Sequence, residues 1–201
     1  MLDSKRTTTE TPYATSADFC QIFSGEMNGL YLLAFLLTAD REKAEQCFVS
    51  GLEDAVQGNP VFKEWARSWA RRVIIQNAVR LIKPQPAERN GRSRSGSVNG
   101  NDLPAAQQVE VAAVLALEPF ERFVYVMTVL ERYSDHECSL LLGCGRRDVI
   151  DARTRALREL GSSIERLHNQ LSNNKPETPR ARERRSSVFE LPITPRLVTA
   201  S

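Results

Sequence analysis

Residues 134–155 read SDHECSLLLGCGRRDVIDARTR, and this stretch carries the strongest structural signal in the chain. It opens with a capping box, because the Ser134 hydroxyl can cap a helix while the Glu137 side chain returns to the Ser134 N–H. Three leucines, the turn Gly143-Cys144-Gly145 and a longer helical segment follow. The apolar face of that segment consists of Val149, Ala152, Ala156, Leu160, Ile164 and Leu167. A short capped helix, a glycine turn and a longer helix form the pattern of a helix-turn-helix.

The start of the second helix carries the charges that bear on DNA binding. In a helix-turn-helix this helix lies in the major groove, with its N-terminal residues at the base edges. Arg146 and Arg147 stand at this position, whereas Asp148 and Asp151 on the same turns would repel phosphate. Three further arginines continue the positive charge, namely Arg153, Arg155 and Arg158. Residues 134–168 hold six basic and six acidic side chains, so we expect weak binding by this unit alone. A purely structural helical hairpin is the alternative.

The segment before the capping box predicts two more helices. The module begins near Leu103-Pro104, and residues 109–116 have the composition of a helix. Leu117-Glu118-Pro119 ends that helix, since proline cannot continue it. Apolar residues then recur at helical steps over residues 120–130.

A long apolar stretch dominates the first half of the chain. Ser16 is the expected N-cap, and apolar residues then recur at steps of three and four through residue 37, which predicts one long helix. Because residues 31–37 are apolar nearly all round, this helix must pack on more than one side. The chain restarts at Thr38-Ala39-Asp40, and the next helix runs to about Gln57, where Gly58 stops it.

A third helix is expected between Asn59-Pro60 and Lys83-Pro84. Trp65 and Trp69 belong to its apolar stripe, so we expect both to be buried. Another face of this helix is basic, with six basic residues in the segment against one acidic residue. Basic and aromatic side chains together can hold single-stranded bases by charge and stacking, although an ordinary solvated face has the same composition.

The chain therefore predicts an all-α protein of two small helical modules. Residues 16–83 form the first module, and residues 103–170 form the second, which contains the helix-turn-helix. Residues 84–102 are rich in Pro, Gly, Ser, Asn and Arg and are expected to be a flexible linker. Residues 1–15 and the basic residues 171–201 are expected to be a disordered arm and a disordered tail.

Composition and motif content exclude several classes of protein. The net charge of +2 is too small to indicate nucleic acid on its own. No apolar run reaches the roughly 18 residues of a membrane span, and the N-terminus lacks the layout of a signal peptide, so we expect a cytoplasmic protein. The cysteines are scattered without a CxxC pair, which favours buried reduced thiols and no metal site. Without a nucleophile–base–acid set or a phosphate-binding loop, no enzyme, cofactor or small-molecule substrate is expected.

Together these segments resemble, in diverged form, a bacterial RNA polymerase sigma factor of the small, two-domain extracytoplasmic-function type. The first module is similar to the second region of that family in the order of Leu30-Tyr31-Leu32-Leu33-Ala34, Leu37-Thr38-Ala39-Asp40, Ala44-Glu45 and Trp69. The second module is similar to the fourth region in Leu117-Glu118-Pro119-Phe120-Glu121-Arg122, Glu137, Leu142-Gly143, Val149 and Arg155-Ala156. The resemblance covers roughly residues 18–168.

The resemblance implies a transcription initiation protein that binds core RNA polymerase and promoter DNA, with an anti-sigma protein as a further partner. The clamp of the polymerase would contact Ala44, Glu45, Gln46 and Val49. The melted promoter strand would contact Arg67, Arg71, Arg72, Gln76, Asn77 and Arg80. Duplex promoter DNA would contact Arg146, Arg147, Asp148, Ile150, Asp151, Thr154 and Arg155.

Two sets of residues depart from the family's pattern. The family commonly has Ala-Glu-Asp followed by Gln three positions on, where this chain has Gln46 and Val49. Its recognition helix commonly reads Thr-Val-Lys-Ser-Arg, where residues 148–152 here read DVIDA. Two alternatives stay open: a stand-alone helix-turn-helix regulator, and a sigma-like adaptor that binds other transcription proteins.

Overall fold

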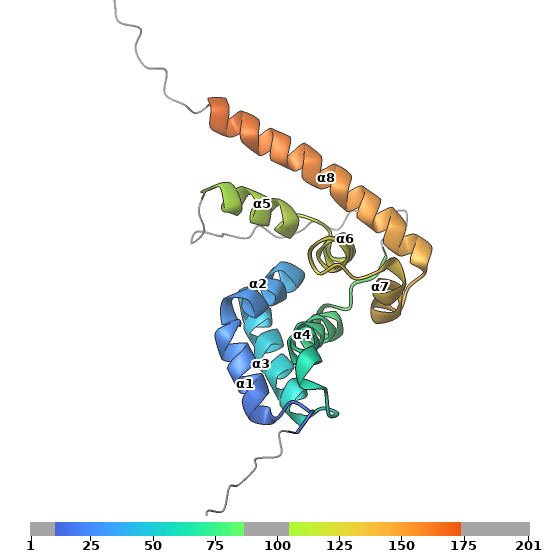
Figure 1. The fold of residues 1–201 in the computed structure, drawn as a ribbon. Coiled ribbons are helices and arrows are strands. Elements are labelled where there is room, and N and C mark those ends of the chain that lie inside the picture. Colours follow the sequence, from blue (N-terminus) through green and yellow to red (C-terminus); the bar gives the residue numbers. More distant parts are fainter. Residues whose placement is uncertain (1–10, 87–104, 174–201) are drawn as a thin grey trace, which may run out of the picture.

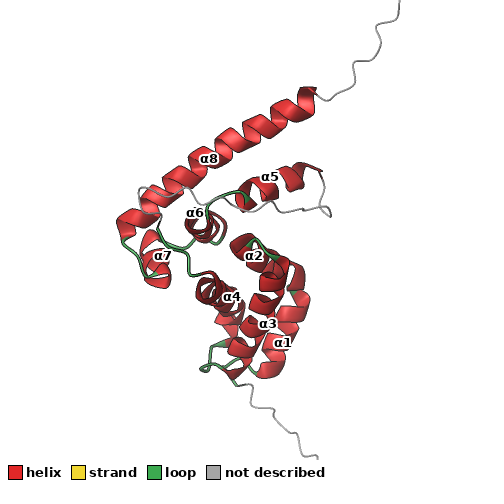
Figure 2. Cartoon of the chain, turned by 180° about the vertical axis from the view of Figure 1, so that it is seen from behind, coloured by secondary structure: helices red, strands yellow, loops and turns green. Residues whose placement is uncertain are grey.

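The computed structural model describes residues 11–86 and 105–173, and both segments are mainly helical (Figures 1 and 2). The elements are α1 (Ser16–Gly25), α2 (Met27–Thr38), α3 (Arg41–Gln57), the 3-10 turn η1 (Lys63–Trp65), α4 (Ala66–Ile82), α5 (Ala105–Leu115), α6 (Pro119–Tyr125), the π-helical turn η2 (Val126–Leu130), α7 (Asp135–Leu142) and α8 (Arg146–Asn173). Within the described residues the extended pairing is limited to one isolated bridge, between Tyr13 and Phe62. The predicted all-α class is therefore confirmed.

The N-terminal apolar stretch forms two helices, so the prediction of one long helix is wrong. α1 ends at Gly25 and α2 begins at Met27, because Glu26 between them leaves helical geometry, at φ −109° and ψ 19°. The two helices are bent by 78° relative to each other. Gly25 and Gly29 flank the break, and glycine is a poor helix former, so the chain interrupts the helix here at little cost.

Within residues 11–86, two helix starts are held by side-chain caps. At α1 the cap is Thr15, one residue before the predicted Ser16, and its hydroxyl accepts a hydrogen bond from the Asp18 N–H over 3.3 Å. At α3 the Asp40 carboxylate accepts from the Lys43 N–H over 3.0 Å. The acidic restart of the chain before α3 is therefore confirmed, as is the predicted end of that helix at Gln57.

The loop before α4 pairs with the segment before α1, and this pairing delays the start of α4. The Ala14 N–H donates to the Val61 carbonyl over 2.7 Å, which keeps this loop extended. The predicted helix start at Asn59-Pro60 is therefore wrong, since α4 begins at Ala66 after the short turn η1. The predicted end is confirmed, because Lys83 takes the left-handed conformation that closes α4.

α2 is the central helix of the first group, α1–α4. It packs against α1, α3 and α4, and it also contacts α5, α6 and η2 of the second group, α5–α8. Leu30, Ala34 and Leu37 have no exposed surface, and Leu33 is 3% exposed. The expectation that an all-round apolar helix packs on several sides is confirmed.

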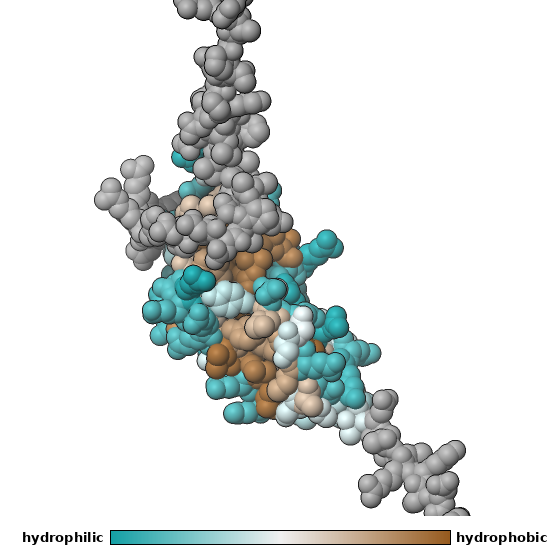
Figure 3. Space-filling view, turned by 90° about the vertical axis from the view of Figure 1, so that its left-hand side faces the viewer, coloured by the Kyte–Doolittle hydropathy of each residue, from teal (hydrophilic) through white to brown (hydrophobic). Residues whose placement is uncertain are grey.

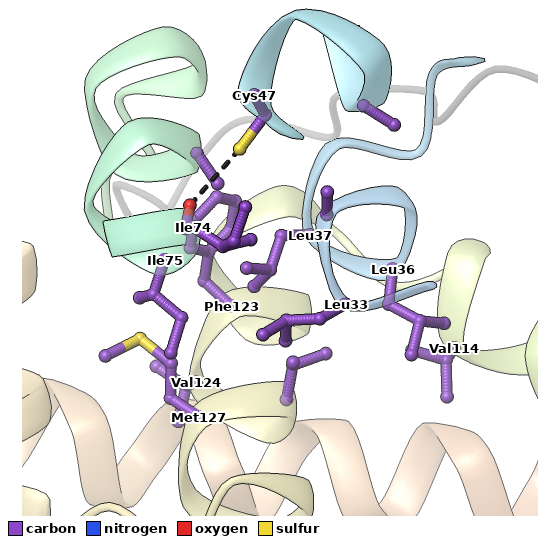
Figure 4. Close-up of a cluster of buried hydrophobic side chains, with 14 of the residues drawn as sticks. Leu33, Leu36, Leu37, Cys47, Ile74, Ile75, Val114, Phe123, Val124 and Met127 are labelled. Carbon is purple, nitrogen blue, oxygen red and sulfur yellow. Dashed lines mark hydrogen bonds between the residues drawn. The ribbon is translucent and has the colours of Figure 1, made fainter. Parts of the chain in front are cut away.

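The two helix groups share one hydrophobic core. Figure 4 shows side chains of α2, α4, α5, α6 and η2 converging in this core, among them Leu36, Val114, Ile75 and Met127. Each large apolar side chain that is fully buried contributes about 1.5–3 kcal/mol, so this contact is a substantial part of the stability of both groups. The segments predicted as separate modules therefore pack directly against each other.

Residues 1–10, 87–104 and 174–201 lie outside the described residues, and with them lies most of the predicted arm, linker and tail. α8 continues to Asn173, past the predicted end of the second module at residue 170. Among the helices of the two described segments, none is both long enough and apolar enough to cross a membrane on its own.

Candidate nucleic-acid interface

The predicted pair of helices is present as α7 and α8, joined at Gly143. The Ser134 hydroxyl accepts from the Glu137 N–H over 3.2 Å, and the Glu137 carboxylate accepts from the Ser134 N–H over 2.8 Å, so the capping box is confirmed. α7 ends where Gly143 takes the left-handed conformation at φ 65°, which favours glycine. The Cys144 N–H then donates to the Ser139 carbonyl over 3.1 Å and closes the turn.

One face of α8 holds the helix against α6 and α7. Val149, Ala152 and Ala156 on this face have no exposed surface, and Leu160 is 6% exposed. The side chains of Ile164 and Leu167, which the periodicity places on the same face, lie outside the described residues. With this face buried, the opposite face of the first turns is directed to solvent.

The first turn of α8 exposes Arg146 and Arg147. Within residues 11–86 and 105–173, neither guanidinium forms an ion pair. Asp148 accepts a hydrogen bond from the Gly145 N–H over 3.0 Å, so its carboxylate caps the helix that carries the two arginines. Ile150, Asp151 and Thr154, which were also predicted to contact duplex DNA, are exposed on the following turns.

Two arginines of α8 form ion pairs with other helices of the protein. Arg155, predicted to contact duplex DNA, lies 2.6 Å from the Glu121 carboxylate of α6. Arg153 lies 2.5 Å from the Asp135 carboxylate at the start of α7. Both pairs fix the position of α8, and they leave fewer free cations for DNA than the sequence indicates.

Several residues predicted to contact a melted strand also make contacts within the first group. Asn77 and Arg80 both donate hydrogen bonds to the Asp54 carboxylate of α3. The Arg67 side chain is 78% exposed, and its guanidinium lies 3.3 Å from the Glu26 carboxylate. Two further residues of this predicted set are half-buried, namely Arg72 and Gln76.

Arg71, the sixth of these residues, joins the two helix groups. Its guanidinium donates two hydrogen bonds to the carboxylate of Glu131, which follows η2 and whose side chain is 8% exposed. These hydrogen bonds raise the pKa of Arg71, which therefore stays charged. A residue that the resemblance assigns to single-stranded DNA is thus paired with the second helix group.

Arg122 is a buried cation that sequence reasoning did not single out. It is 3% exposed and donates to the carbonyls of Leu37, Leu115 and Leu117 over 3.3, 3.3 and 2.9 Å. Burial lowers its pKa to about 10, against the opposite effect of Glu118. Because one of these carbonyls belongs to α2, the side chain ties the first group to the start of α6.

The residues predicted to contact the polymerase lie on α3. Ala44 has no exposed surface, whereas Glu45 and Gln46 are exposed and Val49 is 54% exposed. Figure 3 views the side on which α1, α2 and α3 lie in Figure 1, and apolar surface gathers there in a band between polar side chains. Three of the four predicted residues are therefore accessible to a partner.

The prediction that both tryptophans are buried is wrong for Trp65. It is 58% exposed and packs edge-on against Phe62, with ring centres 5.4 Å apart, and Phe62 stacks on Tyr13 at 4.8 Å. Trp69 is half-buried, and its Nε1 has no acceptor within the described part of the chain. We call Tyr13, Phe62 and Trp65 the aromatic row. It was not predicted, because its members come from two segments that the bridge brings together.

The cysteines are only partly as expected. Cys47 and Cys138 are buried, and burial raises the pKa of each thiol to about 12, which keeps both protonated. Cys20 is exposed, so the expectation of buried thiols is wrong at this position, and Cys144 is half-buried. Among the described residues, no cluster of three or more His, Cys, Asp or Glu side chains has the arrangement of a metal site.

Comparisons with known proteins return no family: no protein-family model matches the chain, and no curated protein matches it significantly. Functional inference therefore depends on the geometry of α7 and α8 and on the resemblance described above.

Proposed function

We propose that the chain is a sigma-factor-like transcription initiation protein that recognises promoter DNA through the start of α8 and binds core RNA polymerase through α3. The exposure of Arg146 and Arg147 on a helix whose opposite face is buried is the observation that supports DNA recognition most. A helix held in this way can enter a major groove with its first turn at the base edges. The order of the sigma-like segments supports the polymerase as a partner.

The charge distribution predicts how DNA binding depends on salt. Arg153 and Arg155 are paired within the protein, and Arg166 lies far along the helix, so Arg146, Arg147 and the exposed Arg158 supply the free charge of the N-terminal half of α8. Each neutralised phosphate contributes about −0.9 to the slope of log K against log salt, so we expect a shallow slope of about −2 to −3 for the isolated protein. Binding strong enough for promoter recognition then requires the polymerase.

The DNA-binding part of the proposal is tested with a variant of the first turn of α8. Fluorescence anisotropy of a labelled duplex, titrated with the free chain, measures the affinity. We expect the double variant Arg146→Ala/Arg147→Ala to bind at least about tenfold more weakly than the native chain. The matched control for duplex binding by the free chain is Arg41→Ala/Lys43→Ala, which removes two adjacent exposed cations from another helix. Equal affinity of the native and Arg146→Ala/Arg147→Ala proteins would contradict the role of α8.

The polymerase-binding part is tested separately. The native chain should co-elute with core RNA polymerase in gel filtration, and Val49→Arg should abolish this by placing a charge on the exposed apolar position of α3. Leu157→Arg, a matched change at an exposed leucine of α8, should leave co-elution intact. Duplex binding without co-elution would replace the proposal with a stand-alone regulator, and absence of both would leave the protein-binding adaptor.

A further inference from the structure

A groove runs between the start of α4 and the loop that joins η2 to α7. Its volume is about 530 Å³, which lies within the range of roughly 300–1,000 Å³ for small-molecule sites. Phe62, Trp65, Trp69 and Arg72 line it from the first helix group, and Arg132 and Tyr133 line it from the second. Both groups therefore contribute to one concave surface.

The aromatic side of this groove is unusually open. Trp65 and Phe62 are 58% and 40% exposed, although large aromatic side chains contribute most when they are covered. The edge-on contact of their rings and the stacking of Phe62 on Tyr13 hold both side chains in place. A flat ring system can stack on such a surface without a rearrangement of the protein.

Three arginines and two glutamates line the groove, so its net charge is small and positive. Glu131 is neutralised by Arg71, and the Glu137 carboxylate accepts hydrogen bonds from Ser134 at the start of α7. Within the described residues, Arg72 and Arg132 form no ion pair, although Arg72 lies close enough to Tyr133 and Glu137 to oppose the effect of burial on the pKa of each. Two guanidinium groups from opposite walls are thus available to an anion, and guanidinium groups bind carboxylate and phosphate with planar, charge-assisted hydrogen bonds.

The backbone at Arg132 adds a second observation. Arg132 takes the left-handed conformation at φ 59° just after η2, as Ala39 and Lys83 do at the ends of α2 and α4. Arg132 is exposed, whereas Glu131 and Tyr133 on either side are half-buried, so the chain leaves η2 with this side chain open at the groove.

We propose that this groove binds a small planar aromatic anion about the size of a mononucleotide. Its ring system stacks on Trp65, and its phosphate or carboxylate is held by Arg72 and Arg132. Only two unpaired cations line the groove, beside two carboxylates, which suits a single anionic group better than the repeated phosphates of a nucleic-acid strand. Because the ligand contacts both helix groups, it also favours the arrangement in which they are packed together.

Intrinsic fluorescence provides a direct test, because the chain contains two tryptophans and both line the groove. Titration of the full chain with adenosine 5′-monophosphate should give saturable quenching. Adenosine, which lacks the anion, and inorganic phosphate, which lacks the ring, should not reproduce it over the same concentrations. Arg72→Ala/Arg132→Ala should weaken the apparent affinity at least about tenfold, whereas Arg41→Ala/Lys43→Ala should leave it unchanged.

The remaining outcomes discriminate against the proposal. Absence of saturable quenching by the nucleotide, or equal quenching in the native and Arg72→Ala/Arg132→Ala proteins, would overturn it. If a single-stranded oligonucleotide quenches and the mononucleotide does not, the groove belongs to a nucleic-acid surface and the small-ligand proposal fails. Should the double variant not fold, the single change at exposed Arg132 decides the matter. The result is independent of the role of α8, which is measured through Arg146 and Arg147.

Discussion

At the scale of residues, the buried Arg122 is expected to contribute substantially to stability, because its hydrogen bonds join the two helix groups. Replacing Arg122 by Ala leaves three buried carbonyls without their donor and removes side-chain volume from the contact between the two groups. We expect the free energy of unfolding to fall by about 2–4 kcal/mol, measured by urea denaturation. Arg147→Ala, at an exposed position, should change it by less than about 0.5 kcal/mol. Similar values for the two variants would contradict the role assigned to Arg122.

The capping box predicts a pH dependence. Hydrogen bonds from Ser134 lower the pKa of Glu137 in the folded protein below its ordinary value of 4.5. The stabilisation is therefore complete above the unfolded-state pKa and is lost as the pH falls through the folded-state pKa. In thermal melts across the acid range, Glu137→Gln should lose less stability on acidification than the native chain. Glu45→Gln, at an exposed position of α3, should keep the native profile, and identical profiles for all three proteins would refute the assignment.

At the scale of elements, the angle between α7 and α8 depends on Gly143. No heavy atom lies within 4 Å of the position that a Cβ would take at Gly143, so the cost of a substitution is confined to the left-handed backbone. We expect Gly143→Ala to destabilise the protein by about 1–2 kcal/mol in urea denaturation. Gly161→Ala, also in open space but within α8, should stabilise it by up to about 1 kcal/mol. A Gly143→Ala protein as stable as the native chain would show that the turn does not require glycine.

At the scale of the whole molecule, the shared core predicts one cooperative unfolding transition. Both tryptophans belong to the first helix group, so tryptophan fluorescence reports on the unfolding of that group, whereas far-UV circular dichroism reports on all helices. The unfolding transitions measured by the two methods should coincide. Met127→Ala, in the second group, should lower stability by about 2–5 kcal/mol and shift the tryptophan-detected transition equally. A tryptophan transition that does not move would show that the groups unfold independently, as a flexible tether alone would allow.

The helix starts and turns that could be predicted from the sequence depend on residues that are close together in the chain. The restart of the chain at Asp40, the cap at Ser134 and the glycine turn at Gly143 depend on neighbouring residues, so their positions could be predicted from the sequence. The break at Glu26 was missed because apolar periodicity continues across it. The late start of α4 depends on pairing with the segment before α1, which no local pattern indicates.

The chain's own pattern of residues was sufficient for the all-α class, the α7–α8 turn and the position of Arg146 and Arg147 at a helix start. Packing alone established which charges are free and that the two groups share a core. The reason is distance along the chain: the Arg71–Glu131 pair joins residues 60 positions apart, and the bond from Arg122 to Leu37 spans 85. Periodicity and capping act over one or two turns, so they contain no information about partners so remote.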